Sequence, residues 1–259
     1  MQSMPITAMA LLLAHLLGDF PLQSEWISRN KDSNLRALLL HGGIHYLLAW
    51  ACLLFFTPVS GLSIVNHLLI LGYIIIHLLI DKLKCRLTSR KTLPDDAKTF
   101  LLDQLVHVAV LACVVLLLTW DRNQAGQLVE HVAQWMPTKA HVLEVAIVYV
   151  AVVFGGGCLI RYLTKGLARQ TPVSPGDQLP NAGLYIGWLE RLLVLTAIVV
   201  QTPTLVGLIL TGKSIARFPE LKNAGFVEYF LIGTLLSLSL SLLGGIVLHQ
   251  LLYGTVSLK

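Results

Sequence analysis

Long apolar runs separated by short charged segments limit most strongly what this chain can fold into. A helix that crosses a bilayer needs about 20 mostly apolar residues, and runs of this kind recur through the 259 residues. Only 13% of the residues are charged and 55% are hydrophobic, whereas a soluble domain carries about 25% charged residues. A soluble fold could not bury so much apolar surface. The sequence therefore predicts an all-α, polytopic integral membrane helix bundle.

The apolar runs predict about eight membrane spans. The first four cover residues 5–22, 37–56, 64–83 and 99–120, and the others cover 142–163, 184–200, 205–216 and 226–252. The seventh is short enough to be re-entrant or interfacial. The predicted parts are a four-helix domain (1–122), an outer amphipathic segment with the fifth span (123–167), a proline-rich loop (168–182) and a three-helix part (183–259).

The distribution of charge in the loops predicts the orientation. Lysine and arginine gather in the loops after spans one, three, five and seven, which the positive-inside rule places in the cytoplasm. Both termini then face the outside. These loops account for the net charge of +5, and no basic tail indicates nucleic-acid binding. We expect membrane lipid as the partner, and a homo-oligomer is compatible with the sequence.

Histidine and aspartate occur in pairs four residues apart, one pair in each of the first four spans. Residues at this spacing share one face of a helix. The pairs are His15 and Asp19, His41 and His45, His77 and Asp81, and Asp103 and His107. Spans one and three run inward and read His then Asp, whereas span four runs outward and reads Asp then His. This reversal predicts a shared cluster of two layers, about 6 Å apart, near the cytoplasmic ends of the spans.

The chemistry of this cluster favours a divalent metal site. An aspartate inside a span costs several kcal/mol unless it is paired or faces a polar cavity, and each of the three has a histidine four residues away. Imidazole and carboxylate are ordinary ligands of zinc and similar ions. We predict one or two ions on these eight residues, most plausibly zinc, with manganese or iron as alternatives. A proton relay and a structural polar core are the competing interpretations.

Other polar side chains are candidates for contacts with a substrate. The amides and ammonium groups near the cluster are Gln23, Lys31, Lys82 and Gln104. The basic groups of the back half are Arg191, Lys213 and Arg217. An amide could orient a ligand, and a cation could hold an anionic headgroup. Interfacial solvation, the positive-inside bias and an ion-paired helix junction are the ordinary alternatives.

The front motifs resemble those of an uncharacterised bacterial family of integral membrane proteins, a domain of unknown function. The pattern H-x-x-x-D-F-x-x-Q runs from His15 to Gln23, H-x-x-x-H ends at His45, and H-x-x-x-D ends at Asp81. The resemblance covers about the first 120 residues, and the back half is similar to the extension of longer members. It implies a bacterial inner-membrane protein but no activity. More distantly, the spans are similar to membrane-bound metal-dependent hydrolases.

Three functions remain open on the sequence. The first is a metal-dependent hydrolase of a phospholipid or lipid-linked phosphate, in which the metal activates water and Asp19, Asp81 or Asp103 acts as general base. The second is a divalent-cation or proton transporter, since intramembrane acids and histidines also serve translocation. Against it, the cluster lies near one membrane face and no inverted repeat is present. The third is a non-enzymatic membrane subunit with the metal as a folding staple.

Overall fold

The computed structural model describes residues 3–57, 63–119, 136–168, 181–222 and 224–254, and every secondary-structure element in these ranges is helical. The all-α prediction is therefore confirmed for this part of the chain. Contacts divide the chain into two compact units, residues 1–147 and 148–259. The predicted outer amphipathic helix (124–135) and most of the proline-rich loop lie outside the described residues.

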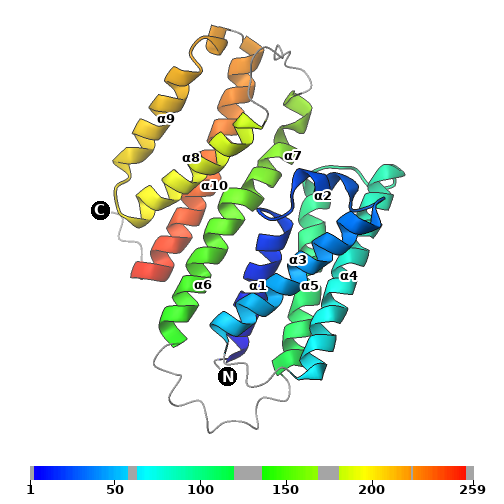
Figure 1. The fold of residues 1–259 in the computed structure, drawn as a ribbon. Coiled ribbons are helices and arrows are strands. Elements are labelled where there is room, and N and C mark those ends of the chain that lie inside the picture. The colour runs from blue at the N-terminus through cyan, green and yellow to red at the C-terminus, as the bar shows by residue number, and fades with distance from the viewer. Residues whose placement is uncertain (1–2, 58–62, 120–135, 169–180, 223, 255–259) are drawn as a thin grey trace. The chain divides into compact units, whose positions relative to one another are not determined.

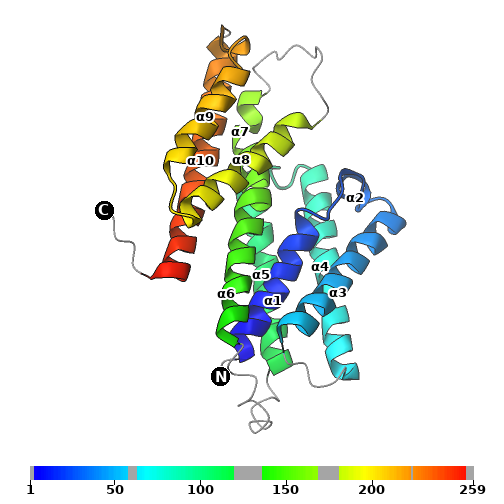
Figure 2. The ribbon, with the colours of Figure 1, turned by 60° about the vertical axis from the view of Figure 1, so that its left-hand side comes forward.

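The first unit contains a bundle of four helices closed into a ring. The helices of the ring are α1 (Ser3–Asp19), α3 (Leu35–Phe56), α4 (Ile64–Ser89) and α5 (Ala97–Thr119). Helix α1 packs against α3 and α5, and α4 packs against the same two helices (Figure 1). A short helix, α2 (Glu25–Asn30), packs against α3 at one end of the bundle (Figure 2). Each His/Asp pair thus lies on a different helix of one ring.

The first helix ends earlier than the sequence predicted, at Asp19 instead of residue 22. Pro21 explains this end, because proline disfavours the helical conformation of Phe20 and has no N–H to donate. The short helix α2, which the sequence did not predict, follows with Ser24 as its N-cap. A carboxylate at a helix C-terminus faces the negative end of the helix dipole. Asp19 therefore needs positive or hydrogen-donating partners from neighbouring helices.

The second unit is built from the later helices. They are α7 (Gly156–Ala168), α8 (Ala182–Val199), α9 (Thr204–Ala216), the 3₁₀ turn η3 (Glu220–Lys222) and α10 (Ala224–Tyr253). Helix α10 packs against α7 and α8, and α8 packs against α9. Where one span, 142–163, was predicted, α6 (Met136–Val150) continues through the π-helix η2 (Ala151–Gly155) into α7. The π-helix interrupts the regular α-helical bonding, as it often does at functional positions.

The helices bury the paired histidines and aspartates within an apolar core and expose many large apolar side chains. In the described residues, six helical stretches are long and apolar enough to cross a membrane, and Ile6–Asp19 and Thr204–Ala216 are shorter apolar helices. Leu47 is 69% exposed, whereas His41 and His77 are 0% exposed. A surface rich in exposed apolar side chains suits lipid as the surrounding solvent. The chain is thus a multi-pass membrane protein with six to eight candidate spans, and its orientation stays a prediction.

Candidate metal centre

The four His/Asp pairs converge in the interior of the first unit. On α3 the buried residues recur every three or four positions through Ala37, His41, His45 and Ala49, and the paired residues of α4 and α5 continue similar buried stripes. All five histidines of the cluster are at most 1% exposed. The helical spacing of each pair therefore places both of its side chains on the face that packs against the other helices.

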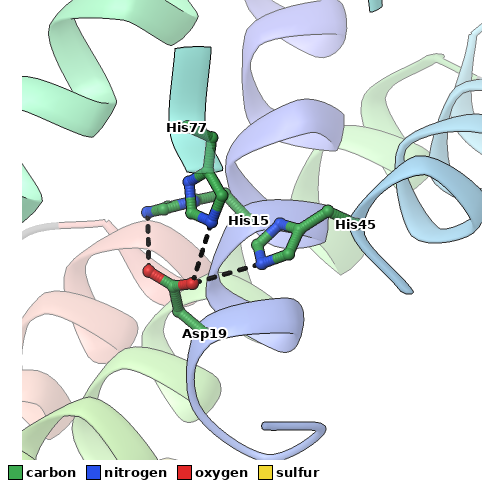
Figure 3. A group of neighbouring side chains, drawn as sticks. All are labelled: His15, Asp19, His45 and His77. Atoms are coloured by element: carbon green, nitrogen blue, oxygen red, sulfur yellow. Dashed lines mark hydrogen bonds and ion pairs between the residues drawn. The ribbon is translucent and has the colours of Figure 1, made fainter. Parts of the chain in front are cut away.

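Asp19 is the centre of the cluster. Its Oδ1 atom lies 3.2 Å from Nε2 of His45, 3.4 Å from Nε2 of His77 and 3.6 Å from Nε2 of His41. Its Oδ2 atom lies 3.6 Å from Nε2 of His15. Figure 3 shows three of these rings directed at one carboxylate from three different helices. We call His15, Asp19, His45 and His77 the quartet.

The spacing of the quartet fits a tetrahedral metal site. Zinc–nitrogen bonds of about 2.0–2.1 Å place the ligand atoms of a tetrahedron about 3.4 Å apart. The two Asp19 oxygens lie 3.2–3.6 Å from the three rings, Oδ1 from His45 and His77 and Oδ2 from His15. One ligand atom from each of the four residues lies within 4.8 Å of every other. The donor atoms are thus positioned to surround one small cation.

Unsatisfied nitrogen atoms in the cluster also indicate a missing ligand. Both ring nitrogens of His15 are buried without a hydrogen-bond partner, although its Nε2 atom is directed at Asp19. Buried polar atoms are almost always paired, because leaving one unpaired costs free energy. His107 is oriented differently: its Nδ1 lies 2.8 Å from the backbone oxygen of Asp103. Its Nε2 atom lies 3.4 Å from the backbone oxygen of His77, so both ring nitrogens of His107 face carbonyl oxygens.

The other two aspartates already have cationic partners. Nζ of Lys31 donates to Asp81 at 2.6 Å, and Nζ of Lys84 donates to Asp103 at 2.8 Å. Burial alone would lower the pKa of Lys31, but the carboxylates of Asp81 and Asp19 raise it above its ordinary value. Asp19 instead has imidazole rings and an amide around it. This division of charge favours one ion on the quartet over two ions shared by all three carboxylates.

Two further groups of possible ligands are connected to the quartet, the first directly through His77 and the second through the first. One combines His41, His77 and Asp81, and the other combines Asp81 with Asp103 and His107. In the first, Nε2 of His41 lies 3.2 Å from both Nε2 of His77 and Oδ2 of Asp81. Because His77 and Asp81 are each shared, the three groups are parts of one connected polar network.

The candidate substrate groups of the first unit divide into those that reach the cluster and one that does not. Nε2 of Gln104 donates to Asp19 at 3.2 Å, and Nε2 of Gln23 lies 3.4 Å from Nε2 of His41. Lys31 contacts Asp81, as described. Lys82 has no hydrogen bond or ion pair among the described residues. In the second unit, Arg191, Lys213 and Arg217 line a separate cavity.

The sequence interpretation missed Lys84. At about 100° per residue, position 84 lies only about 60° around the helix from Asp81, whereas position 82 lies about 100° away. Lys84 therefore points nearer the cluster and meets Asp103 on α5. Helical phase was the signal that could have identified it. Its partner was not apparent, because that contact joins two helices.

Gly18 permits the close approach of His45, and its substitution is a test of the packing. A Cβ atom at position 18 would lie 2.5 Å from both Cε1 and Nε2 of the His45 ring. We expect Gly18→Ala to displace that ring, lower stability by about 1–3 kcal/mol and weaken metal binding. Metal titration and thermal unfolding measure both effects. Gly43→Ala on α3, where a Cβ meets nothing within 4 Å, is the control and should bind metal normally.

One comparison with known proteins found a relationship. A family model described as "Protein of unknown function (DUF3307)" matches residues 7–136, a range that includes all eight residues of the cluster. No curated protein and no solved structure matches the chain. The matched region coincides with the part of the chain that forms the ring of helices, so the cluster lies within the portion that defines the family.

Proposed function

We propose that this chain, which belongs to the DUF3307 family of proteins of unknown function, is a membrane-embedded, metal-dependent hydrolase. The observation that carries the proposal is the arrangement of the quartet. Three imidazoles from three helices approach one carboxylate at 3.2–3.6 Å, a spacing suited to one divalent ion. Zinc is our first choice because imidazole and carboxylate are among its ordinary ligands, with manganese and iron as alternatives.

Groups beyond the quartet support catalysis. Metal binding by the quartet alone would not require the Lys31–Asp81 and Lys84–Asp103 pairs. Both carboxylates are at most 7% exposed, and burying ion pairs is often no better for stability than apolar packing. Their presence beside the proposed metal site supports a chemical role. Acidic and basic groups within reach of a bound ion are what hydrolysis needs.

The residues can be assigned roles in hydrolysis. A divalent ion in the quartet would act as a Lewis acid that acidifies a bound water and polarises a phosphoryl or acyl oxygen. Asp103 is suited to hold the proton, because its Oδ1 atom is buried without a hydrogen-bond partner. Hydrolysis adds water across an ester bond, so the hydroxyl joins phosphorus or the acyl carbon. The proton taken by Asp103 then returns to the leaving alcohol oxygen.

A phosphate-bearing amphiphile suits the surroundings of the centre. Lys31 and Lys84 bring two ammonium groups to the cluster, and ammonium groups bind phosphate well. Nearby on the helices, Leu40 is 50% exposed and Leu83 is 56% exposed, as expected for surfaces in contact with lipid. We therefore propose a phospholipid or a lipid-linked phosphate as substrate. The loop charges favour the cytoplasmic leaflet, and we propose a bacterial inner membrane because the sequence resemblance implies one.

Turnover by metal-loaded protein tests this function. We expect the protein in nanodiscs to hydrolyse phosphatidylglycerol, phosphatidylethanolamine or polyprenyl phosphate, followed by phosphorus NMR and by mass spectrometry of released fatty acid. Asp103→Asn should lower the rate about 100-fold or more while the protein still binds metal. Asp32→Asn, which changes an exposed carboxylate of the same unit, should keep full activity. Full activity in Asp103→Asn would remove that residue from the mechanism.

A structural metal ion that stabilises the fold is the second candidate, and the number of protein ligands favours it. Four protein ligands can close a tetrahedral zinc site, as in structural zinc centres, and the quartet joins α1, α3 and α4. In that case chelation would unfold the protein, and metal-loaded protein would turn over no lipid. Transport is less favoured by the geometry. A small cavity lined by Thr7, Trp50 and Asn66, among others, measures about 10 Å³, which is about the room for one water molecule.

A further inference from the structure

The second unit contains a large basic cavity between α7, α8, α9 and α10. Its volume is about 980 Å³, within the range of cavities that bind small molecules. The charged side chains that line it are Arg161, Lys165, Glu190, Arg191, Lys213 and Arg217. Five cations and one carboxylate thus line the cavity, and two of the cations, Lys213 and Arg217, are paired with acidic side chains. An excess of positive charge in an apolar setting favours an anionic ligand.

Arg191 is a buried cation that the protein holds in place with neutral partners. It is 4% exposed, and its Nε and Nη2 atoms donate to the backbone oxygen of Val153 at 2.9 and 2.7 Å. Its Nη1 atom donates to Oγ of Ser237 at 3.4 Å. Val153 belongs to the π-helix η2, where the altered backbone bonding leaves a carbonyl available. Three of the five N–H groups of the guanidinium are thus used, and none of them meets a carboxylate.

The surrounding backbone is shaped around this guanidinium. A Cβ atom at Gly157 would lie 2.7 Å from Nη2 of Arg191, and one at Gly187 would lie 3.3 Å from Nη1. Larger residues at these positions would displace the charge. A buried cation without a counter-ion is costly. Among the described residues, no carboxylate accepts a hydrogen bond from this guanidinium. An anion that enters the cavity could supply that direct partner.

The other charged side chains of the cavity indicate which further groups of a ligand could bind there. Lys213 is neutralised by Oε2 of Glu190 at 2.6 Å, and Arg217 by Glu220 at 3.2 Å. Among the described residues, Arg161 makes only a long contact of 3.8 Å to the sulfur of Cys158, and none of these contacts is with a carboxylate. Glu190 is 5% exposed, and its Oε1 atom is buried without a hydrogen-bond partner. That oxygen can accept a hydrogen bond from a hydroxyl group of the ligand.

We propose that this cavity binds the headgroup of an anionic phospholipid, with its phosphate on Arg191 and Arg161 and a hydroxyl donor on Glu190. Apolar side chains such as Phe226 and Phe230 also line the cavity, where they can contact the start of an acyl chain. Phosphatidylglycerol has the matching groups: one phosphate, two hydroxyls and a net negative charge. Binding here does not require catalysis at the quartet, so either proposal can fail alone.

Ligand-dependent thermal stabilisation of the full-length protein in detergent tests the proposal, with affinities taken from titration. We expect phosphatidylglycerol to stabilise and phosphatidylcholine, which has no hydroxyl donor and no net charge, to have little effect. Arg161→Gln should weaken phosphatidylglycerol binding about tenfold or more, the size expected when a charged hydrogen bond is lost. Arg86→Gln, an exposed arginine on α4 of the first unit, should bind as the wild type does.

Soluble phosphates, phosphatidylcholine and the arginine variants distinguish the possible results of this experiment. Inorganic phosphate and glycerol 3-phosphate probe the soluble sources of the same chemistry: affinity equal to that of phosphatidylglycerol would keep the phosphate site but overturn the lipid as its source. Equal stabilisation by phosphatidylcholine would overturn the proposal, as would unchanged binding in Arg161→Gln. Arg191→Gln is predicted to lose binding as well. If that variant does not fold, Arg161→Gln, which alters an exposed side chain, still decides.

Discussion

Replacing His45 and His77 together by alanine should remove the bound divalent ion from the purified protein. The two rings supply two of the four ligands of the quartet, and losing ligands leaves too few donors to hold an ion against water. We expect about one ion per wild-type chain and less than about a tenth of that in the double variant. Elemental analysis by mass spectrometry of detergent-purified protein measures this directly.

The control for this experiment is His141→Ala. The side chain of His141 is 54% exposed and pairs with Glu144 outside the cluster, so its removal should leave the metal content unchanged. Two ions per wild-type chain would instead mean that Asp81 and Asp103 also bind metal and exchange their lysine partners for it. Absence of metal from the wild-type protein would contradict the metal hypothesis, and the cluster would then be better interpreted as a proton relay.

Lys31→Met should destabilise the protein by about 3–5 kcal/mol, the usual effect of removing one partner of a buried ion pair. The side chains of Lys31 and Asp81 are 12% and 7% exposed, so Asp81 would keep its charge in an apolar interior without its ammonium partner. Unfolding in mixed micelles, followed by fluorescence, measures the change. The double variant Lys31→Met, Asp81→Asn should recover much of the loss, because no uncompensated charge remains.

A neighbouring lysine supplies the control for the ion pair. Lys82→Met removes the same charge from a side chain that makes no ion pair among the described residues, and it should change stability by no more than about 0.5 kcal/mol. The pKa of Lys31 is raised, so the stabilisation is present at neutral pH and is lost only as pH rises through the alkaline range. Equal effects of the Lys31 and Lys82 variants would show that the Lys31–Asp81 contact contributes little.

The membrane class, most of the long helices and the candidate ligands could be predicted from the sequence alone. Apolar runs define spans because a bilayer requires length and hydrophobicity, which are local properties. The spacing of four residues places His77 and Asp81 on one face whatever surrounds them. The reversed order in Asp103 and His107 followed from the alternating direction of successive spans. These are properties of single helices and of their order along the chain.

Only the tertiary structure decided how the charges are shared. Lys84 and not Lys82 reaches Asp103, and Lys31 reaches Asp81 from the end of α2, a helix that the sequence did not predict. Those contacts leave Asp19 as the carboxylate surrounded by imidazole rings. Likewise, the π-helix that holds Arg191 by the carbonyl of Val153 is not apparent from apolar periodicity. Contacts between helices depend on rotation and packing, and no local pattern of residues specifies these.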